Sequence, residues 1–462
     1  MDYIYNFSIN WASHTKIKIK MISLKKFKNK YFAIYGMGKT GIATTKALQR
    51  YKIKLSCWDD NRKQRNKMQN LKFPIKKFWN LKNKKNLDYI VISPGININK
   101  CKIKSFLKKN INKVITDLDL FFDNNKYKTI ISITGTNGKS TTCKILEKIF
   151  KSAGYPVQLG GNIGKPVLSL KEIHKKGIYI LEISSYQLAY SKPLRSNHAA
   201  ILNITPDHLD RHVNLNNYIK AKSKIFLSQR NTDFSYLNNS NKYNKKIIKF
   251  VKNKNRKSKF IYINKKNYSL LLKKTKNNYF KNEANLENLS FAYEIAKKFG
   301  IKDEVIFNTI NKFNGLPHRQ EIIFSNKKFK FINDSKATSF HSCLQSLKSY
   351  DNIYWIVGGL AKDKDNFNLR EVSHKIKKAY IIGRQTNKFK NILENNINYS
   401  VTHDLPNTFK YLIKDIKNKK ENNCTVLLSP GAASFDQFKN FEERGNFFKS
   451  IVKEKIKTIT NA

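Results

Sequence analysis

The chain has few cysteines, and none of them forms a C-x-x-C pair. Disulfide frameworks and zinc knuckles need clustered or regularly spaced cysteines. The five cysteines are instead scattered along the 462 residues, as Cys57, Cys101, Cys143, Cys343 and Cys424. The sequence therefore argues against both kinds of site, and its cysteine usage suits a reducing cytoplasm.

Long apolar runs are missing as well. No window approaches the ~18 unbroken apolar residues of a membrane-spanning helix. The N-terminus has Asp2 and lacks the apolar stretch of a signal peptide. We therefore expect no membrane span and a cytoplasmic protein. Residues 1–23 contain no clear element, and we expect an N-terminal extension there that need not be ordered.

Acidic residues are scarce: 32 Asp and Glu stand against 90 Lys and Arg, a formal net charge of +58 at pH 7. The excess is mostly lysine, spread through segments such as KIKIK and KNKNRKSK. A nucleic-acid-binding surface clusters its basic residues and interleaves arginines or aromatics. We therefore predict no nucleic-acid partner, and expect the positive field to attract anionic substrates.

What the chain has in quantity is an alternation of strand-like and helix-like segments. Its length exceeds one hydrophobic core and predicts two to four domains. Segment 285–300 has the pattern of a helix that ends at Gly300. Segment 31–50 has the pattern of a strand, a glycine turn and a helix, and another strand opens at Thr129. Apolar runs typical of strands also lie at 87–96, 177–189, 198–205 and 259–263. The alternation restarts after residue 317 and predicts α/β domains with mainly parallel sheets.

The segment GTNGKST (135–141) lies between such a strand and an amphipathic helix. Gly135 and Gly138 let the backbone wrap an anion, Lys139 adds a positive charge, and the Ser140 hydroxyl can bind Mg²⁺. The spacing G-x-x-G-K-S is two residues shorter than that of the common P-loop. The simpler interpretation, a glycine turn before a helix, is the weaker one here.

A second glycine-rich turn, GMGKTG (36–41), follows the first predicted strand. Asp59 and Asp60 stand close to the acidic position that a dinucleotide site requires. The turn is compatible with NAD or with another diphosphate nucleotide, because it recognises pyrophosphate. Tight packing between helix and strand is the structural alternative.

Two further segments place polar groups at predicted strand ends. Glu182 lies inside a run that looks buried, where an unpaired carboxylate is costly and a metal partner would account for it. NITPDHLDRH (203–212) supplies His208 as a candidate ligand and His212 as a structural histidine. Composition alone places Lys222 on a solvated surface.

The last third contains GLPHRQE (315–321), NDSKAT (333–338) and SPGAASFDQFKNFEERG (429–445). Lys336, Thr338 and Ser434 could hold a second carboxylate. Ordinary caps and turns explain each segment alone but explain all of them together poorly.

These motifs resemble those of the Mur ligases, the ATP-dependent amide-forming enzymes of peptidoglycan synthesis, over residues 24–455. GTNGKST and DHLDRH are shared with related enzymes such as folylpolyglutamate synthase, whereas GLPHR, NDSKAT and SPGAASFDQFKNFEERG are typical of the D-glutamate-adding branch. The resemblance implies a UDP-N-acetylmuramoyl-L-alanine substrate, D-glutamate, ATP, two Mg²⁺ ions and a monomer. Another Mur-type or folylpolyglutamate-type ligase is the alternative.

The resemblance also implies three domains. These are an N-terminal Rossmann-like domain for the UDP-sugar (24–119), a central P-loop ATPase domain with a mainly parallel sheet (120–316) and a C-terminal Rossmann-like domain for the amino acid (317–462). Lys139, His208 and Lys222 would be catalytic. The implied metal ligands are Ser140, Glu182, His208 and Lys222 as a carbamate.

The remaining implied roles concern the three substrates. ATP would contact Gly135, Thr136, Asn137, Gly138, Lys139, Ser140, Thr141, Asn285, Asn288, Arg319 and Asp334. The UDP substrate would contact Gly36, Gly38, Thr40, Gly41, Asp59, Asp60, Ser93, Asn162 and Ser184. D-Glutamate would contact Lys336, Thr338, Lys362, Ser434, Phe435 and Phe441. The chain departs from the family pattern at GGLAKDKDNF (358–367), around Lys362, and at WDDN (58–61), in the expected uracil pocket.

Overall fold

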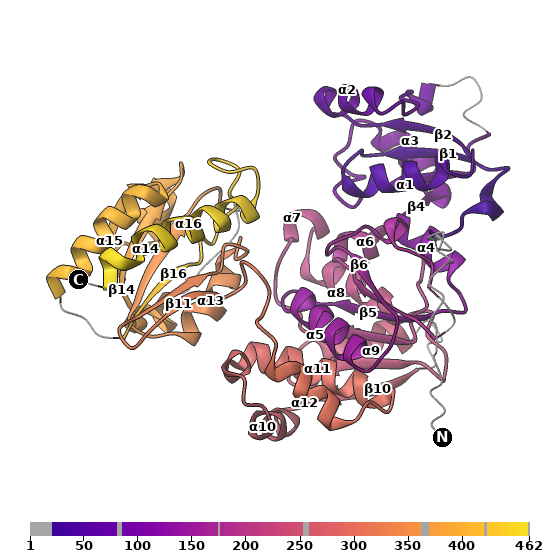
Figure 1. Ribbon diagram of the computed structural model, residues 1–462. Helices are drawn as coiled ribbons and strands as arrows, with labels where there is room; N and C mark the ends of the chain where they lie inside the picture. The colour runs from indigo at the N-terminus through magenta and orange to yellow at the C-terminus, as the bar shows by residue number, and fades with distance from the viewer. Residues whose placement is uncertain are drawn as a thin grey trace, which may run out of the picture. The chain divides into compact units, whose positions relative to one another are not determined.

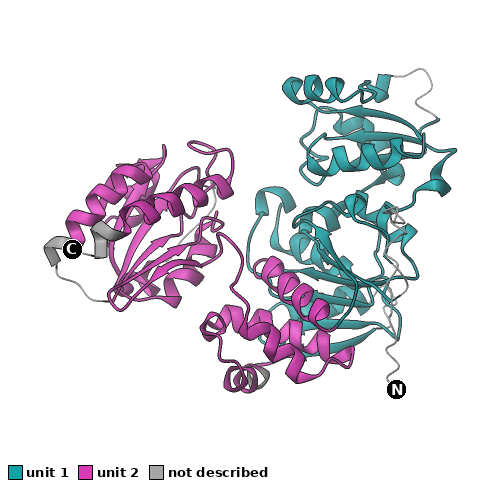
Figure 2. Cartoon of the chain, viewed as in Figure 1, with its two compact units in different colours: residues 1–135, 154–262 teal, residues 136–153, 263–462 magenta. Residues whose placement is uncertain are grey.

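The computed structural model describes residues 21–80, 86–173, 176–252, 258–361, 369–419 and 423–460. It divides into two compact units (Figure 2): unit 1 holds residues 1–135 and 154–262, and unit 2 holds residues 136–153 and 263–462. Three β-sheets are present among the described residues, in the order of the chain (Figure 1). Each sheet falls within one of the three predicted domains, whose boundaries stay predictions.

The first sheet belongs to unit 1 and is parallel throughout, in the order β2-β1-β3-β4. Its core strand β1 is fully buried, as the apolar run YFAIY predicts. The strands are β1 Tyr31–Tyr35, β2 Lys54–Trp58, β3 Tyr89–Ile92 and β4 Val114–Ile115. The helices of this part are α1 Lys39–Gln49, α2 Arg62–Asn70, α3 Lys104–Lys109 and α4 Asp117–Asn124. Ile22, within the predicted N-terminal extension 1–23, is buried with Leu24 in the adjoining core, and residues 1–20 of that extension lie outside the described residues.

The second sheet has the order β10-β9-β8-β5-β7-β6, and β5 to β9 pair in parallel. Its strands are β5 Thr129–Thr134, β6 Val157–Gly161, β7 Ile178–Glu182, β8 His198–Ile201, β9 Phe234–Asn238 and β10 Lys259–Ile263. The helices of unit 1 near it are α6 Ser185–Tyr190, α7 Leu209–His212, α8 Leu215–Ser223 and α9 Asn244–Lys252.

The predicted strand over 177–189 is wrong in its second half. Strand β7 ends at Glu182, and α6 begins three residues later. Ser184 and Gln187 form a capping box, in which each side chain bonds the backbone N–H of the other. This reciprocal cap starts a helix where apolar content alone suggested more strand.

Helices α5 Lys139–Ser152, α10 Lys265–Lys274, α11 Glu283–Lys298 and α12 Asp303–Asn311 belong to unit 2. Helix α5 packs against α11 and α12. Helix α11 confirms the helix predicted over 285–300, and Gly300 follows its C-terminal end with φ of 73°. The 3-10 turn η7 (Asn278–Lys281) precedes α11.

The third sheet completes unit 2 in the order β11-β12-β16-β13-β14-β15. All its pairings are parallel except that of β11 with β12. Alternate residues of β13 enter two separate cores: Trp355 and Val357 enter one, and Tyr354 and Ile356 the other. Its strands are β11 Glu321–Ser325, β12 Phe329–Asn333, β13 Ile353–Gly358, β14 Ile376–Ile382, β15 Tyr399–His403 and β16 Cys424–Leu428. Its helices are α13 Phe340–Ser349, α14 Thr386–Leu393, α15 Leu405–Lys419 and α16 Phe441–Thr460.

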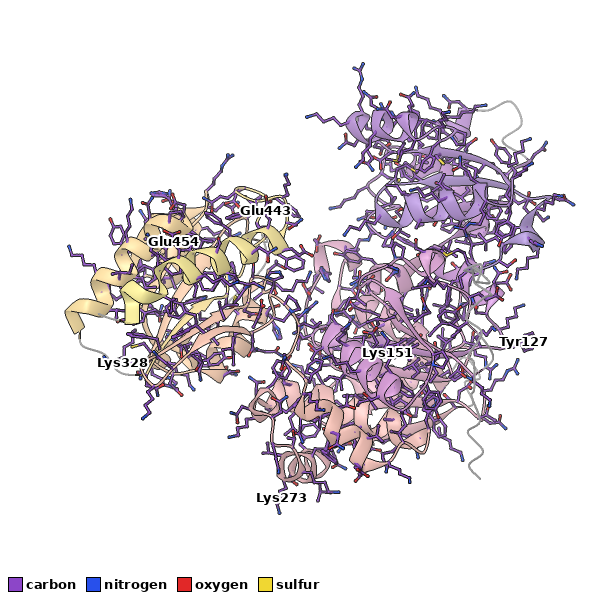
Figure 3. All side chains as sticks on the ribbon, in the orientation of Figure 1. Tyr127, Lys151, Lys273, Lys328, Glu443 and Glu454 are labelled. Carbon is purple, nitrogen blue, oxygen red and sulfur yellow. The ribbon has the colours of Figure 1, made fainter. Side chains whose placement is uncertain are left out.

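Lysine residues occur along the whole chain. Figure 3 labels three such side chains on separate parts of unit 2: Lys151 on α5, Lys273 on α10 and Lys328 between β11 and β12. In the part of the chain that the structure describes, no helix combines the length and apolar character needed to cross a bilayer. That no nucleic acid binds stays a prediction.

Candidate active site

The predicted ATP site involves residues of both units, because the boundary between the units runs through the glycine loop itself. Gly135 closes a stretch of unit 1, and Thr136 opens one of unit 2. The predicted metal ligands Glu182, His208 and Lys222 belong to unit 1, because they lie within its stretch 154–262.

The glycine loop of unit 2 leads directly into α5, whose N-cap is Gly138 with φ of 82°. A Cβ added at Gly138 would lie 2.0 Å from Oδ1 of Asn288 on α11. The same oxygen accepts a hydrogen bond from the Thr142 hydroxyl at 3.3 Å. Only glycine fits between α11 and the start of α5, where the exposed N–H groups of a helix end can bind an anion.

Polar side chains of the loop are already engaged. Lys139 Nζ donates to the carbonyl of Thr136 at 2.6 Å, and the Asn137 amide lies 3.2 Å from Nδ1 of His341. Ser140 Oγ accepts a hydrogen bond from Nη2 of Arg319 at 2.7 Å. The structure thus brings together two residues that are 179 positions apart and that the resemblance assigns to the same nucleotide.

A cavity of about 90 Å³ lies against this loop, within unit 2. Its wall also includes Lys336, which is predicted to contact D-glutamate. The predicted ATP-binding residues on the wall are Asn137, Gly138, Thr141, Asn285, Asn288, Arg319 and Asp334. Thr136, Lys139 and Ser140 join this group through the hydrogen bonds above and by their position in the loop.

Asp334 is the buried carboxylate of this cavity. Its Oδ2 accepts hydrogen bonds from the hydroxyls of Ser346 and Ser429 at 2.5 and 3.1 Å, and its Oδ1 accepts one from the N–H of Gln320 at 3.2 Å. Burial raises the pKa of Asp334 to about 6, while these donors and the charge of Arg319 oppose the rise. Asp334 thus accepts three hydrogen bonds from inside unit 2, which fix the position of its carboxyl group.

The predicted D-glutamate residues follow the ends of β12 and β16. Lys336 Nζ lies 3.9 Å from the centre of the Phe441 ring, a cation–π contact. Ser434 is buried, whereas Phe435 is 71% exposed. Thr338 is half-buried, and Lys362 lies outside the described residues. Lys336 and Phe441 are thus in contact, and the grouping of the full set stays a prediction.

In unit 1, Glu182 is a buried carboxylate at the end of β7. Its Oε1 accepts a hydrogen bond from Nδ2 of Asn162 at 2.6 Å, so a predicted metal ligand and a predicted UDP-substrate residue are neighbours. His208 lies just before α7 with φ of 55°. Its Nδ1 is 2.8 Å from the Tyr186 hydroxyl and its Nε2 is 3.2 Å from Asp207.

Lys222 is 1% exposed, so the interpretation as a solvated surface lysine is wrong. It lies on the buried face of α8, where its Nζ donates to the carbonyl of Gly135 at 2.7 Å and lies 4.7 Å from the Tyr218 ring centre. Burial, and then the charge of Lys222, lowers the pKa of His212 to about 4. The ammonium group therefore points at the first glycine of the loop, within unit 1.

The predicted UDP-binding residues of the first sheet gather at the carboxyl ends of β1, β2 and β3. Asp59 Oδ2 accepts from the N–H of Met37 at 2.6 Å, and Asp60 Oδ2 from the Tyr35 hydroxyl at 2.6 Å. Ser93 Oγ donates to the carbonyl of Gly36 at 2.6 Å. These bonds connect the acidic pair and the loop after β3 to the glycine turn.

The structural alternative for this turn also holds. A Cβ at Gly41 would lie 2.0 Å from the carbonyl oxygen of Gly36, so α1 packs tightly on the turn. Gly38 and Thr40 lie at and just after the start of α1. Ser184 caps α6 on the second sheet, so the contacts it makes are those of a helix cap. Arg211 donates to the carbonyls of Pro94, Gly95 and Ile96, and so ties α7 to the loop after β3.

Two of the predicted metal residues carry oxygen donors, the ligand type that Mg²⁺ prefers: the Ser140 hydroxyl in unit 2 and the buried Glu182 carboxylate in unit 1. Across the described ranges, no three His, Cys, Asp or Glu side chains gather as a metal cluster. A metal site of these residues stays a prediction.

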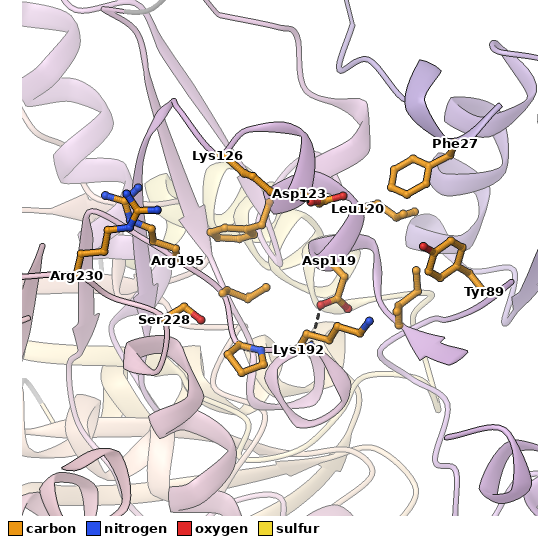
Figure 4. A pocket seen from close by; sticks show the side chains of 14 residues that line it. Phe27, Tyr89, Asp119, Leu120, Asp123, Lys126, Lys192, Arg195, Ser228 and Arg230 are labelled. Atoms are coloured by element: carbon orange, nitrogen blue, oxygen red, sulfur yellow. Dashed lines mark hydrogen bonds and ion pairs between the residues drawn. The ribbon is translucent and has the colours of Figure 1, made fainter. Parts of the chain in front are cut away.

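A separate cavity of unit 1, of about 560 Å³, lies at the opposite, amino-terminal side of the strands (Figure 4). Tyr89 at the start of β3 and Arg195 before β8 line it. Asp119 accepts a hydrogen bond there from the N–H of Lys192 at 2.7 Å. None of the predicted site residues lines this cavity, so it lies apart from the candidate site.

Sequence reasoning missed seven residues on the wall of the cavity beside the glycine loop, the proposed nucleotide cavity: Tyr279, Ala284, Gln320, Ala337, Ser342, Gln345 and Ser346. Gln320 stands inside GLPHRQE and Ala337 inside NDSKAT, so their positions in these motifs were usable signals. Tyr279 and Gln345 stand in no motif, and only the packing of η7 and α13 brings them to the cavity.

Comparison with known protein families agrees with this arrangement. Residues 133–311 match the Mur ligase middle domain, and residues 30–115 match the Mur ligase MurD-like N-terminal domain. The UDP-N-acetylmuramoylalanine–D-glutamate ligase of Rickettsia bellii is 37% identical over 445 residues, which are 91% of this chain and 97% of that protein. The enzyme of the same name from Wolbachia pipientis wMel is 31% identical over 92% of this chain and 97% of its own.

Solved structures share the fold at lower identity. MurC of Thermotoga maritima superimposes with a TM-score of 0.55 at 13% identity, over 92% of this chain and 99% of that one. MurF of Thermotoga maritima in complex with ADP gives a TM-score of 0.52 at 12% identity, over 81% and 91% of the two chains. The matched domain models, the curated relatives and the cavity beside the glycine loop agree: the chain belongs to the Mur ligase family.

Proposed function

We propose that this chain is the ATP-dependent ligase that adds D-glutamate to UDP-N-acetylmuramoyl-L-alanine in peptidoglycan synthesis. The observation that carries the proposal is the cavity of unit 2. It joins Gly138 of the glycine loop to Arg319 of GLPHR and to Asp334 and Lys336 of NDSKAT. The last two motifs are those that resemble the D-glutamate-adding branch.

The reaction requires a carboxylate to be activated before an amine can attack it. Transfer of the γ-phosphoryl group of ATP to the alanyl carboxylate forms an acyl phosphate and releases ADP. The amino group of D-glutamate then attacks the carbonyl carbon, and a tetrahedral intermediate collapses with loss of phosphate. Because no covalent bond to the protein is needed, the residues act by positioning and by electrostatic stabilisation.

Different residues of the chain would bind the different parts of the substrates. The N–H groups at the start of α5 and the charge of Lys139 would bind the phosphates. Asn285, Asn288 and Asp334 would bind the nucleoside part from the cavity wall. Lys336 would bind a carboxylate of D-glutamate, held in place by Phe441.

Ser140, Glu182, His208 and a carbamate of Lys222 would hold Mg²⁺ ions. When bound, these ions would reduce the repulsion between ATP and the incoming carboxylate. Carbamylation would turn the buried ammonium of Lys222, which repels a cation, into an anionic group. The same proposal takes the enzyme to be a monomer that acts in the cytoplasm, where ATP and nucleotide-linked sugars are available.

The proposal is tested by phosphate release from the purified enzyme with ATP, Mg²⁺ and UDP-N-acetylmuramoyl-L-alanine. We expect D-glutamate to stimulate release, and L-glutamate, L-alanine and diaminopimelate to leave it near the background rate. Stimulation by one of the other amino acids alone would assign the chain to a different branch of the family. No stimulation by any of them would contradict the proposal.

A further inference from the structure

Tyr279 lies on the wall of the nucleotide cavity, although no sequence motif marks it. It belongs to η7, directly before α11, and is half-buried. It lines the cavity of about 90 Å³ together with Gly138, Thr141 and Asn285. A neighbouring cavity of about 720 Å³ also has Tyr279 and Asn285 in its wall. Tyr279 therefore borders the space on both sides of Asn285.

The ring of Tyr279 supports the start of the GLPHR turn. A Cβ added at Gly315 would come within 2.6 Å of Cε2 of Tyr279, and Gly315 itself has φ of 74°. The ring of Phe313 meets that of Tyr279 edge to face, with centroids 5.4 Å apart. The path of the chain from Phe313 to Gly315 is thus set by close contact with this ring.

The same turn carries Arg319 to the glycine loop. Leu316 and Arg319 form an isolated antiparallel bridge across it. Arg319 Nη2 then donates to Ser140 Oγ at 2.7 Å. A shift of the turn at Gly315 would therefore move the guanidinium group away from Ser140.

Tyr279 also contacts the helix that closes the cavity from the other side. Its carbonyl accepts a hydrogen bond from Nδ2 of Asn285 on α11 at 3.0 Å. Thr141 of α5 lines the same cavity as Tyr279. Tyr279 is thus fixed to α11 through its backbone, while its ring supports the turn from which Arg319 comes.

We propose that Tyr279 is a positioning residue of the nucleotide site, whose ring holds the GLPHR turn so that Arg319 reaches Ser140. The inference rests on the proposed use of ATP and adds to it a residue that acts through its neighbours. The ring is the part that supports the turn, through its contacts with Gly315 and Phe313.

The experiment compares Tyr279→Leu, which removes the ring, with Tyr279→Phe, which keeps it. ADP affinity is measured by calorimetry on the full-length protein, and KM values for all three substrates by phosphate release. For Tyr279→Leu we expect the Kd of ADP and the KM of ATP to rise at least ~10-fold, with the KM of D-glutamate within about twofold of wild type. For Tyr279→Phe, which keeps the ring contacts with Gly315 and Phe313, we expect both values to stay within about twofold of wild type.

Tyr293→Phe is the matched control. Tyr293 is on α11, donates to Asp303 Oδ1 at 2.9 Å and lines neither cavity, so ADP affinity should stay at the wild-type value. Gly315→Ala disturbs the contact between the Tyr279 ring and the turn from the other side. It should weaken ADP binding in the wild type, where the added Cβ meets the ring, and weaken it less when Tyr279→Leu is already present.

Three outcomes would overturn the inference: wild-type ADP affinity in Tyr279→Leu, equal losses in the Leu and Phe variants, or a parallel rise of all three KM values with a lower Tm. If Tyr279→Leu does not fold, unchanged ADP affinity in Gly315→Ala would overturn it as well. Wild-type enzyme that binds ADP but does not respond to D-glutamate would contradict the proposed function alone. The ADP measurements would still test the role of Tyr279.

Discussion

Among the single residues of the candidate site, Lys222 is the one whose interpretation differs most between composition and structure. The chain is so rich in lysine that no pattern separates this one from the solvated ones. Its position on α8 buries it completely and directs its Nζ at the Gly135 carbonyl. Burying an ammonium group costs free energy, which hydrogen bonds must offset. A buried charged side chain of this kind is typical of a functional site.

We expect Lys222→Ala to lower ligase turnover by about 10–100-fold, the range seen when the support of a metal site is removed. Short carboxylates such as acetate should restore part of the activity, since they supply the anionic oxygens of the proposed carbamate. Phosphate release with and without added carboxylate measures both effects.

The control is Lys220→Ala, on the same helix but exposed, which should leave turnover unchanged. Full activity of Lys222→Ala without any additive would remove Lys222 from the mechanism.

At the scale of elements, the decisive unit is the turn that joins β5 to α5. Its sequence predicts the anion-binding geometry, because a glycine is needed where α5 begins and the N–H groups there are unpaired by the helix. The sequence cannot predict which element closes the turn from the other side. That element is α11, whose Asn288 comes so close to Gly138 that a methyl group has no room.

Gly138→Ala should therefore abolish measurable ADP binding while the protein stays folded. The matched control is Gly154→Ala. Gly154 has the same φ of 82°, but an added Cβ there meets no atom within 4 Å. Both variants carry similar backbone strain, so the difference between them isolates the collision with Asn288.

Calorimetric titration with ADP and thermal unfolding of the two variants provide the measurement. Equal ADP affinities in the two variants would show that strain, and not the contact with α11, governs the loop.

Strands and helices were predicted correctly where apolar residues recur with a clear period. They were missed where another signal sets the end of an element. The buried strands β5 and β7 and the helix near 285–300 follow from apolar periodicity. The start of α6 was missed because the capping box of Ser184 and Gln187 lies inside an apolar run. The antiparallel pairing of β11 with β12 follows from their connection, residues 326–328, which is too short for a parallel crossover, but β11 itself was not predicted as a strand.

At the scale of the whole molecule, the motifs of the three parts predicted the fold class and the family, because their residue types and spacing are typical of that family. The nucleotide cavity could be predicted in its residues and not in its shape. Arg319 and Ser140 are 179 positions apart, and their contact depends on how η7 and the GLPHR turn pack. Tyr279 shows the limit clearly, because its role depends on its neighbours and not on its own chemistry.

The net charge of +58 predicts a property of the entire chain. ATP and the UDP-linked substrate are anions, and a strongly positive field speeds their association in a manner that salt weakens. We expect the KM values of both to rise as NaCl increases from ~0.02 to ~0.2 M, over which range the Debye length falls below ~10 Å. The value of kcat at saturation should change little.

Initial rates at several salt concentrations test this, with KCl in place of NaCl as a check for ion-specific effects. KM values that do not change with ionic strength would mean that the excess lysine has no part in substrate capture.

The hydrogen bond between Arg319 and Ser140 also bears on the proposed metal site. Arg319 fixes the orientation of the hydroxyl that would hold Mg²⁺. Because a guanidinium group and a metal ion are both cationic and would use the same oxygen, we expect the affinity for Mg²⁺ to depend on how firmly Arg319 holds Ser140.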